Sequence, residues 1–289
     1  MVSIGMAWSS KGHQMITVAV LESAALADLP LTAAMKTAMV RASVQPDLMR
    51  PREMPKLRAV EAPQHFIDLE LLQGEPLPAE RWEYVRLLNS LAEKGNGPLR
   101  ADRDVSQAGT APYAIAEGTR RLAAIFAQLR RRPEDEGLQF MAAHQAGFVA
   151  HYAEDLCQPL HTTVHHDGRV RRNGSSPGTG IHGEIDALML VVNPNEVKPS
   201  GRSAEILDPL FPAILTTLHE SHSQVDGVYE LTQALTELDE EGRPPPELVS
   251  FASQRFQYSV NFTSDLIYTA WHLSASIDLP GWASRTYRD

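Results

Sequence analysis

The stretch HYAEDLCQPLH, residues 151–161, carries the most informative pattern in this chain. His151 and Asp155 stand four residues apart, so on a helix both side chains project from one face and can reach a common cation. Pro159 ends or kinks that helix, because proline lacks a backbone N–H and clashes with the preceding turn. We therefore predict a helix from about Glu134 to Leu156, after which His161 approaches from another direction.

The same His-x3-Asp spacing returns in HGEID, where His182 and Asp186 again share one helical face. Taken singly, a histidine or aspartate in a helical protein is most often a surface group or a hydrogen-bonded core residue. Joint order and spacing argue for more than that, because imidazole and carboxylate groups are common zinc ligands. The sequence predicts a cluster of zinc ions built from one ordered series: Trp8, His13, Asp47, His65, His151, Asp155, His161, His182 and Asp186.

Helical periodicity dominates the rest of the chain and predicts an all-α fold. Ser9 or Ser10 can cap a first helix that runs to about Leu29. Four prolines predict a long loop from about Ser43 to Pro78, which would hold Asp47 and His65. Because the ligand series spans most of the chain, we predict a single compact multi-helix domain, residues 8–289, with long loops.

Composition narrows the classes of function. The 289 residues are 43% hydrophobic, enough for a substantial core, and no apolar stretch is long enough to cross a bilayer. A formal charge of -10 argues against binding duplex nucleic acid through a broad basic surface. Cys157 is the only cysteine, so an intrachain disulfide is excluded.

On these residues the chain resembles the zinc-dependent superfamily of phospholipase C and single-strand-specific type I nucleases, closer to the nuclease branch. The resemblance covers about Trp8 to Asp186 and implies an all-α fold with three zinc ions in a cleft. It implies one zinc held by Asp47, His65, His151 and Asp155, and a second held by His161, His182 and Asp186. Asp155 would bridge to a third zinc beside His13.

In the family, the third zinc is bound by the free amine and carbonyl of an N-terminal tryptophan. Here Trp8 follows seven residues, MVSIGMA, whose Gly5 and Ala7 are small residues of the kind that signal peptidases favour. We read residues 1–7 as the remnant of a signal peptide, and cleavage after Ala7 would create the amine. Secretion or a periplasmic location would then follow, while an unprocessed chain leaves a cytoplasmic location open.

The resemblance also implies roles in catalysis and substrate binding. Asp47 would orient the attacking water, and Arg50, three residues on, would neutralise charge on the phosphoryl oxygens. Phe66 and Asp68, in HFID, match nuclease positions that stack on a base and accept hydrogen bonds from its edge. The alternative for Arg50 is a solvated loop charge, and for Phe66 and Asp68 it is packing and local hydrogen bonding.

These expectations lead to a zinc-dependent phosphodiester hydrolase. The primary prediction is an endonuclease on single-stranded RNA or DNA that gives 5′-phosphorylated products and acts also as a 3′-nucleotidase. One alternative is phospholipase C, and Asp186 tilts against it, since we expect a glutamate there in phospholipases. A second alternative is a non-catalytic helical protein stabilised by metal. The predicted partner is a nucleic acid or nucleotide substrate, with no obligate protein partner.

Overall fold

The computed structural model describes residues 8–94, 105–171, 174–192, 201–232, 234–237 and 244–284. Within these ranges the chain forms helices and no strand, apart from isolated bridges that pair Ile67 with Gly109 and His166 with Gly168. The predicted all-α class is confirmed. Residues 1–7, read above as a signal-peptide remnant, lie outside the described residues.

The α-helices are α1 Ser10–Glu22, α2 Ala33–Ala42, α3 Gln45–Leu48, α4 Pro55–Glu61, α5 Arg81–Lys94, α6 Val105–Ala108, α7 Ala111–Arg131, α8 Glu136–Leu156, α9 Ile181–Asp186, α10 Leu210–Ser223, α11 Val225–Glu230 and α12 Pro246–Ser274. Short 3-10 helices lie between them: η1 Ala24–Leu26, η2 Ala62–His65, η3 Leu69–Leu72, η4 Pro159–Thr162, η5 Ala187–Val191, η6 Ala234–Thr236 and η7 Gly281–Ser284.

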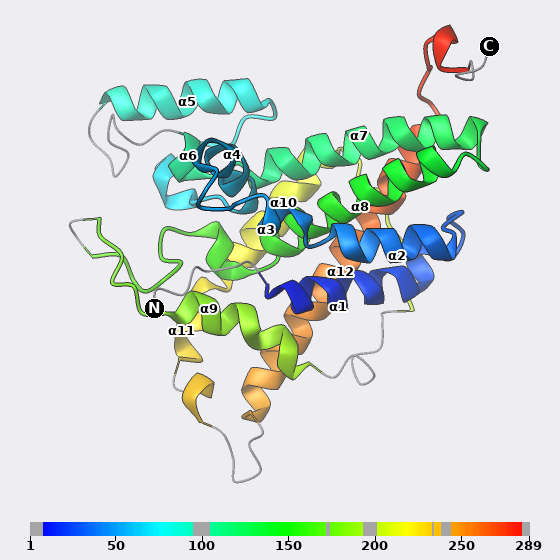
Figure 1. The fold of residues 1–289 in the computed structure, drawn as a ribbon. Coiled ribbons are helices and arrows are strands. Elements are labelled where there is room, and N and C mark those ends of the chain that lie inside the picture. Colours follow the sequence, from blue (N-terminus) through cyan, green and yellow to red (C-terminus); the bar gives the residue numbers. More distant parts are fainter. Residues whose placement is uncertain are drawn as a thin grey trace.

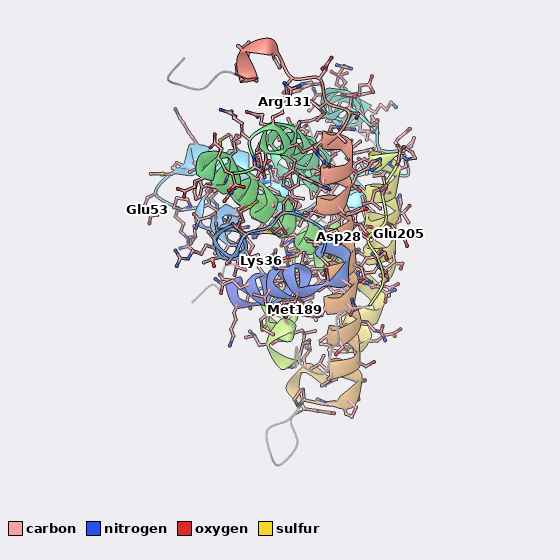
Figure 2. The ribbon with its side chains drawn as sticks, turned by 90° about the vertical axis from the view of Figure 1, so that its right-hand side faces the viewer. Asp28, Lys36, Glu53, Arg131, Met189 and Glu205 are labelled. Carbon is pink, nitrogen blue, oxygen red and sulfur yellow. The ribbon has the colours of Figure 1, made fainter. Side chains whose placement is uncertain are left out.

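Three long helices, α7, α8 and α12, form the centre of the fold. Helices α7 and α8 run side by side, with α2 and α1 beneath them in Figure 1. Figure 2 shows α12 extended along the molecule beside α1. Buried side chains form two clusters that share these helices: one centred on residues such as Ile16, Phe126 and Phe256, the other on residues such as Tyr84, Tyr113 and Phe211. The central helices therefore serve as the frame for the loops and short helices around them.

Small residues let α2 lie very close to α8. A Cβ atom at Gly147 would come within 2.4 Å of Ala42 Cβ and 2.7 Å of the Met39 carbonyl oxygen, so only glycine fits there. This close approach carries the end of α2 toward the last turns of α8. The Ser43 carbonyl then accepts a hydrogen bond from His151 Nδ1 at 2.7 Å.

Two predicted boundaries were wrong. The first helix ends at Glu22 rather than near Leu29, with Ser9 as its N-cap accepting a bond from Gly12 N. The predicted long loop from Ser43 to Pro78 contains α3, α4, η2 and η3, so Asp47 lies in α3 and His65 in η2. The prolines there start short helices instead of preventing them, because proline is well tolerated in a first helical turn.

The segment that holds Phe66 and Asp68 is fixed by Gly109. This glycine has φ +81, and a Cβ atom there would stand 2.1 Å from the Phe66 carbonyl oxygen. Ala111 N donates to that same oxygen at 3.1 Å, and Asp68 N donates to the Ala108 carbonyl at 2.9 Å.

No helix among the described residues is long and apolar enough to span a bilayer.

Candidate metal centre

Six separate elements bring the predicted ligand side chains together. They are α1 with His13, α3 with Asp47, η2 with His65, α8 with His151 and Asp155, η4 with His161, and α9 with His182 and Asp186. Among the described residues, three groups of side chains have ligand atoms within 4.8 Å of one another. The groups are His13, His151 and Asp155; Asp47, His65 and His151; and His161, His182 and Asp186. Each side chain is buried except His182, which is half-buried.

Three histidines have one ring nitrogen fixed by an oxygen outside the cluster. Nδ1 of His13 bonds Glu154 Oε2, Nδ1 of His151 bonds the Ser43 carbonyl, and Nδ1 of His161 bonds the His65 carbonyl, each at 2.7 Å. With the proton held on Nδ1, Nε2 of His151 and of His161 keeps its lone pair. Histidines that bind metals are usually oriented in this way by a second oxygen partner.

Asp155 stands at the centre of the cluster. Its Oδ2 lies 2.9 Å from His65 Nδ1 and 3.4 Å from His151 Nε2, while its Oδ1 lies 3.3 Å from His13 Nε2. Oδ1 is also 3.9 Å from His161 Nδ1. Because its two oxygens face different histidines, this carboxylate is placed to bridge two cations.

The third group is arranged around Asp186, the last residue of α9. Asp186 Oδ2 lies 3.2 Å from His182 Nε2, and Oδ1 lies 4.0 Å from His161 Nε2. Gln158 Nε2 donates to Asp186 Oδ1 at 2.8 Å and fixes the orientation of the carboxylate. Gln158 belongs to the 151–161 stretch, so this stretch supplies three predicted ligands and also positions one from α9.

Unsatisfied polar atoms test whether these residues suit a metal. Among the described residues, all but one of the buried side-chain nitrogen and oxygen atoms without a hydrogen-bond partner belong to predicted ligands, the exception being Thr263 Oγ1. Buried polar atoms normally find partners, since leaving one unpaired costs about 1–3 kcal/mol. Cations would satisfy five of the others, His13 Nε2, Asp47 Oδ2, Asp155 Oδ1, His161 Nε2 and Asp186 Oδ2. His65 and His182 turn the opposite ring nitrogen toward Asp155 and Asp186, so His65 Nε2 and His182 Nδ1 face away from those carboxylates.

Burial and charge set the protonation of the cluster without a cation. Burial acts to raise the pKa of Asp155, but His151 and His161 outweigh it and hold that pKa well below its usual range. Burial lowers the pKa of His161 to about 4 and brings that of His151 well below its usual range. At neutral pH, Asp155 is therefore ionised while His161 and His151 are neutral, the forms in which they bind metals.

His13 is the exception among these histidines. Burial acts to lower its pKa, yet hydrogen bonds with Asp155 and Glu154 raise it to about 10. Burial raises the pKa of Glu154 to about 7. A proton on His13 Nε2 thus occupies the position between His13 and Asp155, and a cation binding there would replace it.

Trp8 is buried beside this position. Its indole Nε1 donates to the Glu154 carbonyl at 2.8 Å, and the next residue, Ser9, donates its backbone N–H to the Asp186 carbonyl at 3.0 Å. Trp8 is therefore bonded to α8 and its neighbour Ser9 to α9, the two helices that carry the His-x3-Asp pairs. Its side chain itself offers no ligand atom.

A pocket of about 350 Å³ opens onto the cluster. His65, His161 and His182 contribute to its wall, together with the predicted Arg50, Phe66 and Asp68. Arg50 Nη2 donates to Asp47 Oδ1, so this guanidinium contacts a predicted ligand directly. The predicted residues Arg50, Phe66 and Asp68 thus line one cavity, and Asp47, which is not in its wall, contacts it through Arg50.

Sequence reasoning missed three residues at the site. Glu154 and Gln158 orient His13 and Asp186, and Arg58 lines the pocket beside Arg50. Their polar side chains within the 151–161 stretch were the available signal for the first two. Nothing in the local sequence marked Arg58, because its place depends on the turn between α3 and α4.

Comparisons with protein-family models, with curated proteins and with solved structures give no match to this chain.

Proposed function

We propose that this protein is a zinc-dependent phosphodiesterase that cleaves single-stranded RNA or DNA to 5′-phosphorylated products and removes 3′-phosphates from nucleotides. Three features support the proposal. Buried imidazoles and carboxylates converge with unpaired atoms, a pocket opens onto them, and Arg50, Phe66 and Asp68 line that pocket. Structural zinc sites are usually closed, whereas a ligand cluster in the wall of an open pocket leaves room for substrate.

The observation that carries the proposal is the unpaired state of the inward-facing ligand atoms. Asp47 Oδ2, His161 Nε2 and Asp186 Oδ2 are buried without a hydrogen-bond partner. In a purely structural cluster these atoms would be expected to bond to each other or to neighbours. Zinc suits this cluster better than magnesium or calcium, because histidine nitrogens are common zinc ligands whereas magnesium and calcium prefer oxygen ligands.

Each side chain then has a definite task. When bound, zinc would lower the pKa of a bound water and stabilise the departing oxygen. The residues that would hold it are His13, Asp47, His65, His151, Asp155, His161, His182 and Asp186, together with Trp8. Asp47 orients the attacking water, and its contact with Arg50 holds that guanidinium at the cluster. Arg50 neutralises charge on the phosphoryl oxygens. Phe66 stacks on a base, while Asp68 accepts hydrogen bonds from its edge.

The test uses the purified zinc-loaded protein with single-stranded RNA, a 3′-mononucleotide and phosphatidylcholine. Turnover of the two nucleotide substrates is expected, and Asp155→Asn should reduce it by more than about 100-fold while circular dichroism stays unchanged. Asp226→Asn, an exposed carboxylate paired with Arg169, is the matched control and should keep full activity. Unchanged turnover in Asp155→Asn contradicts the bridging role, and zinc binding without turnover of any substrate supports the non-catalytic alternative.

A specific observation favours phospholipase C as the second candidate. Leu48, Met54 and Val60 are 66%, 58% and 69% exposed, and in the sequence they flank Arg50 and Arg58, which line the pocket. Exposed apolar side chains on the short helices that supply residues to a pocket suit contact with lipid more than stacking on bases. Turnover of phosphatidylcholine without nucleotide turnover would establish this candidate instead.

The proposal includes processing before Trp8 and export from the cytoplasm. A free amine at Trp8 would supply the third zinc with a ligand that a peptide nitrogen replaces poorly. Intact mass and zinc content of the protein from its native host test this together. A chain that begins at Trp8 and holds three zinc ions is expected, whereas a retained leader with three zinc ions contradicts the role of the amine.

A further inference from the structure

Two arginines line the pocket, Arg50 and Arg58, and their hydrogen bonds differ. Arg50 Nη2 donates to Asp47 Oδ1 and so reaches the ligand cluster. Arg58, on α4, donates from Nη1 to the Arg50 carbonyl at 3.0 Å and touches no predicted ligand. Arg58 therefore stands one step farther from the cluster than Arg50.

Arg58 has no carboxylate partner within the described part of the chain, whereas Arg50 pairs with Asp47. It is half-buried and borders the pocket. The bond to the Arg50 carbonyl uses one N–H and limits how the guanidinium can turn. The remaining donors are left for a ligand, and a planar guanidinium matches the oxygens of a phosphate.

The surrounding charge also suits an anion. Residues 50–58 contain Arg50, Arg52, Lys56 and Arg58 against a single carboxylate, Glu53, in a chain of net charge -10. Arg52, Glu53 and Lys56 are exposed, and Figure 2 places Glu53 at the outer edge of the molecule. A local excess of positive charge thus extends from the pocket wall to the surface, as expected along the path of a phosphate backbone.

We infer that Arg58 binds the phosphate next to the one that is cleaved, so that the site selects a strand with at least two phosphodiester linkages over a single nucleotide. This inference rests on the proposed function. Arg50 serves the cleaved phosphate because it contacts Asp47, and Arg58 serves its neighbour because it lies beyond Arg50. Arg58 is a substrate-binding residue with no part in holding metal.

The test changes the enzyme and the substrate together. The substrates are a trinucleotide with two phosphodiesters and two analogues in which one linkage or the other is an uncharged methylphosphonate. For the wild type, kcat/KM for cleavage at the remaining phosphodiester should fall about 10- to 100-fold in at least one analogue. Arg58→Ala should lower kcat/KM for the parent trinucleotide by the same factor. It should lower kcat/KM for that analogue no further, because the substitution and the neutral linkage remove the same contact.

Three controls complete the experiment. Arg86→Ala removes an exposed cation on α5 and should behave as the wild type on every substrate. Arg58→Lys keeps the charge and should recover part of the sensitivity to the neutral linkage. Hydrolysis of a 3′-mononucleotide, zinc content and circular dichroism should be the same in Arg58→Ala and the wild type.

The outcomes separate this inference from the proposed function. If the wild type cleaves the nucleotides and Arg58→Ala loses activity equally on the mononucleotide and both kinds of trinucleotide, the second phosphate is not bound by Arg58. If the neutral linkage costs Arg58→Ala as much as it costs the wild type, the inference is likewise overturned. If the wild type cleaves none of these substrates, the proposed function itself fails.

Discussion

Glu154 and Asp155 are neighbours in the chain and perform different tasks at the cluster. Asp155 faces the histidines with both oxygens. Glu154 is fully buried and accepts hydrogen bonds from His13 Nδ1 at 2.7 Å and Thr17 Oγ1 at 2.9 Å. A carboxylate that accepts a hydrogen bond from the histidine nitrogen not used for metal binding fixes the tautomer and strengthens the histidine as a ligand.

Glu154→Gln should therefore lower the zinc affinity of the position beside His13 by about 10- to 100-fold, because a neutral amide is a weaker acceptor for His13 Nδ1 than the carboxylate. The measurement is competition for zinc against a chelator of known affinity, with circular dichroism as the check on folding. Glu83→Gln, on a half-exposed side chain of α5, is the control and should bind zinc as the wild type does. Equal zinc affinity in Glu154→Gln and the control would mean that this carboxylate plays no part in metal binding.

Cys157 illustrates how burial alone controls chemistry. The residue lies in the second hydrophobic cluster and is inaccessible to solvent. Burial raises the pKa of its thiol to about 12. At pH 8 the native protein should resist an aromatic disulfide reagent, whereas the chain in guanidinium chloride should release one equivalent of chromophore.

The sign of the linkage for Cys157 follows from the same shift. Between an unfolded pKa of 9.0 and a folded pKa of about 12, the folded state keeps a proton that the unfolded chain loses. Its contribution to stability is therefore complete below pH 9.0 and declines as the pH rises toward 12. Rapid labelling of the native protein at pH 8 would contradict both statements.

At the scale of elements, the contact between α2 and α8 decides where the ligands meet. Gly147 allows α2 to approach α8, and this places the Ser43 carbonyl on His151 Nδ1. Helix α3 follows directly, and it carries Asp47 to within 3.9 Å of His151 Nε2. A change at Gly147 therefore reaches the cluster without touching a ligand.

Gly147→Ala should destabilise the protein by about 2 kcal/mol or more, although alanine is by itself the better helix former by about 1 kcal/mol. The added methyl group has to move the backbone of α2, so zinc affinity should fall as well. Denaturant unfolding and zinc titration measure the two effects. Gly227→Ala in α11 is the matched control, since nothing lies within 4 Å of its new Cβ, and it should be neutral or slightly stabilising.

At the scale of the whole molecule, the cluster joins segments from α1 to α9 and places several carboxylates in the interior. Asp155, Asp186 and Glu154 are all buried, as is Asp47. Buried charges of one sign are costly unless cations or hydrogen bonds compensate them. Stability of the fold and occupancy by metal should consequently be linked.

Removal of metal with a chelator should lower Tm, and zinc should restore it. At a free zinc concentration 100 times the Kd, one site adds about 2.7 kcal/mol to the free energy of unfolding. A change of about 1 kcal/mol shifts Tm by about 2–4 °C in a protein of this size class. Two or three ions should therefore raise Tm by about 10 °C or more. Calorimetry with measured zinc content tests this, and magnesium, which prefers oxygen ligands, should not replace zinc. An unchanged Tm after complete removal of zinc contradicts a metal-dependent fold.

The sequence alone determined the all-α class, the helix that carries His151 and Asp155, and the shorter one that carries His182 and Asp186. These were predictable because the helical repeat fixes the direction of side chains three or four residues apart. It did not determine the short helices between Ser43 and Pro78, where prolines begin turns instead of excluding them. Local pattern cannot separate those two outcomes, because neighbouring elements decide whether a short helix is stabilised.

Only the tertiary structure decided which residues act together at the site. The grouping of His151 with both His13 and Asp47, the support of His13 by Glu154, and the place of Arg58 beside Arg50 all join elements remote in sequence. Residue spacing constrains geometry within one helix but not the distance between helices. That distance depends on packing, here on the close approach of α2 to α8 at Gly147.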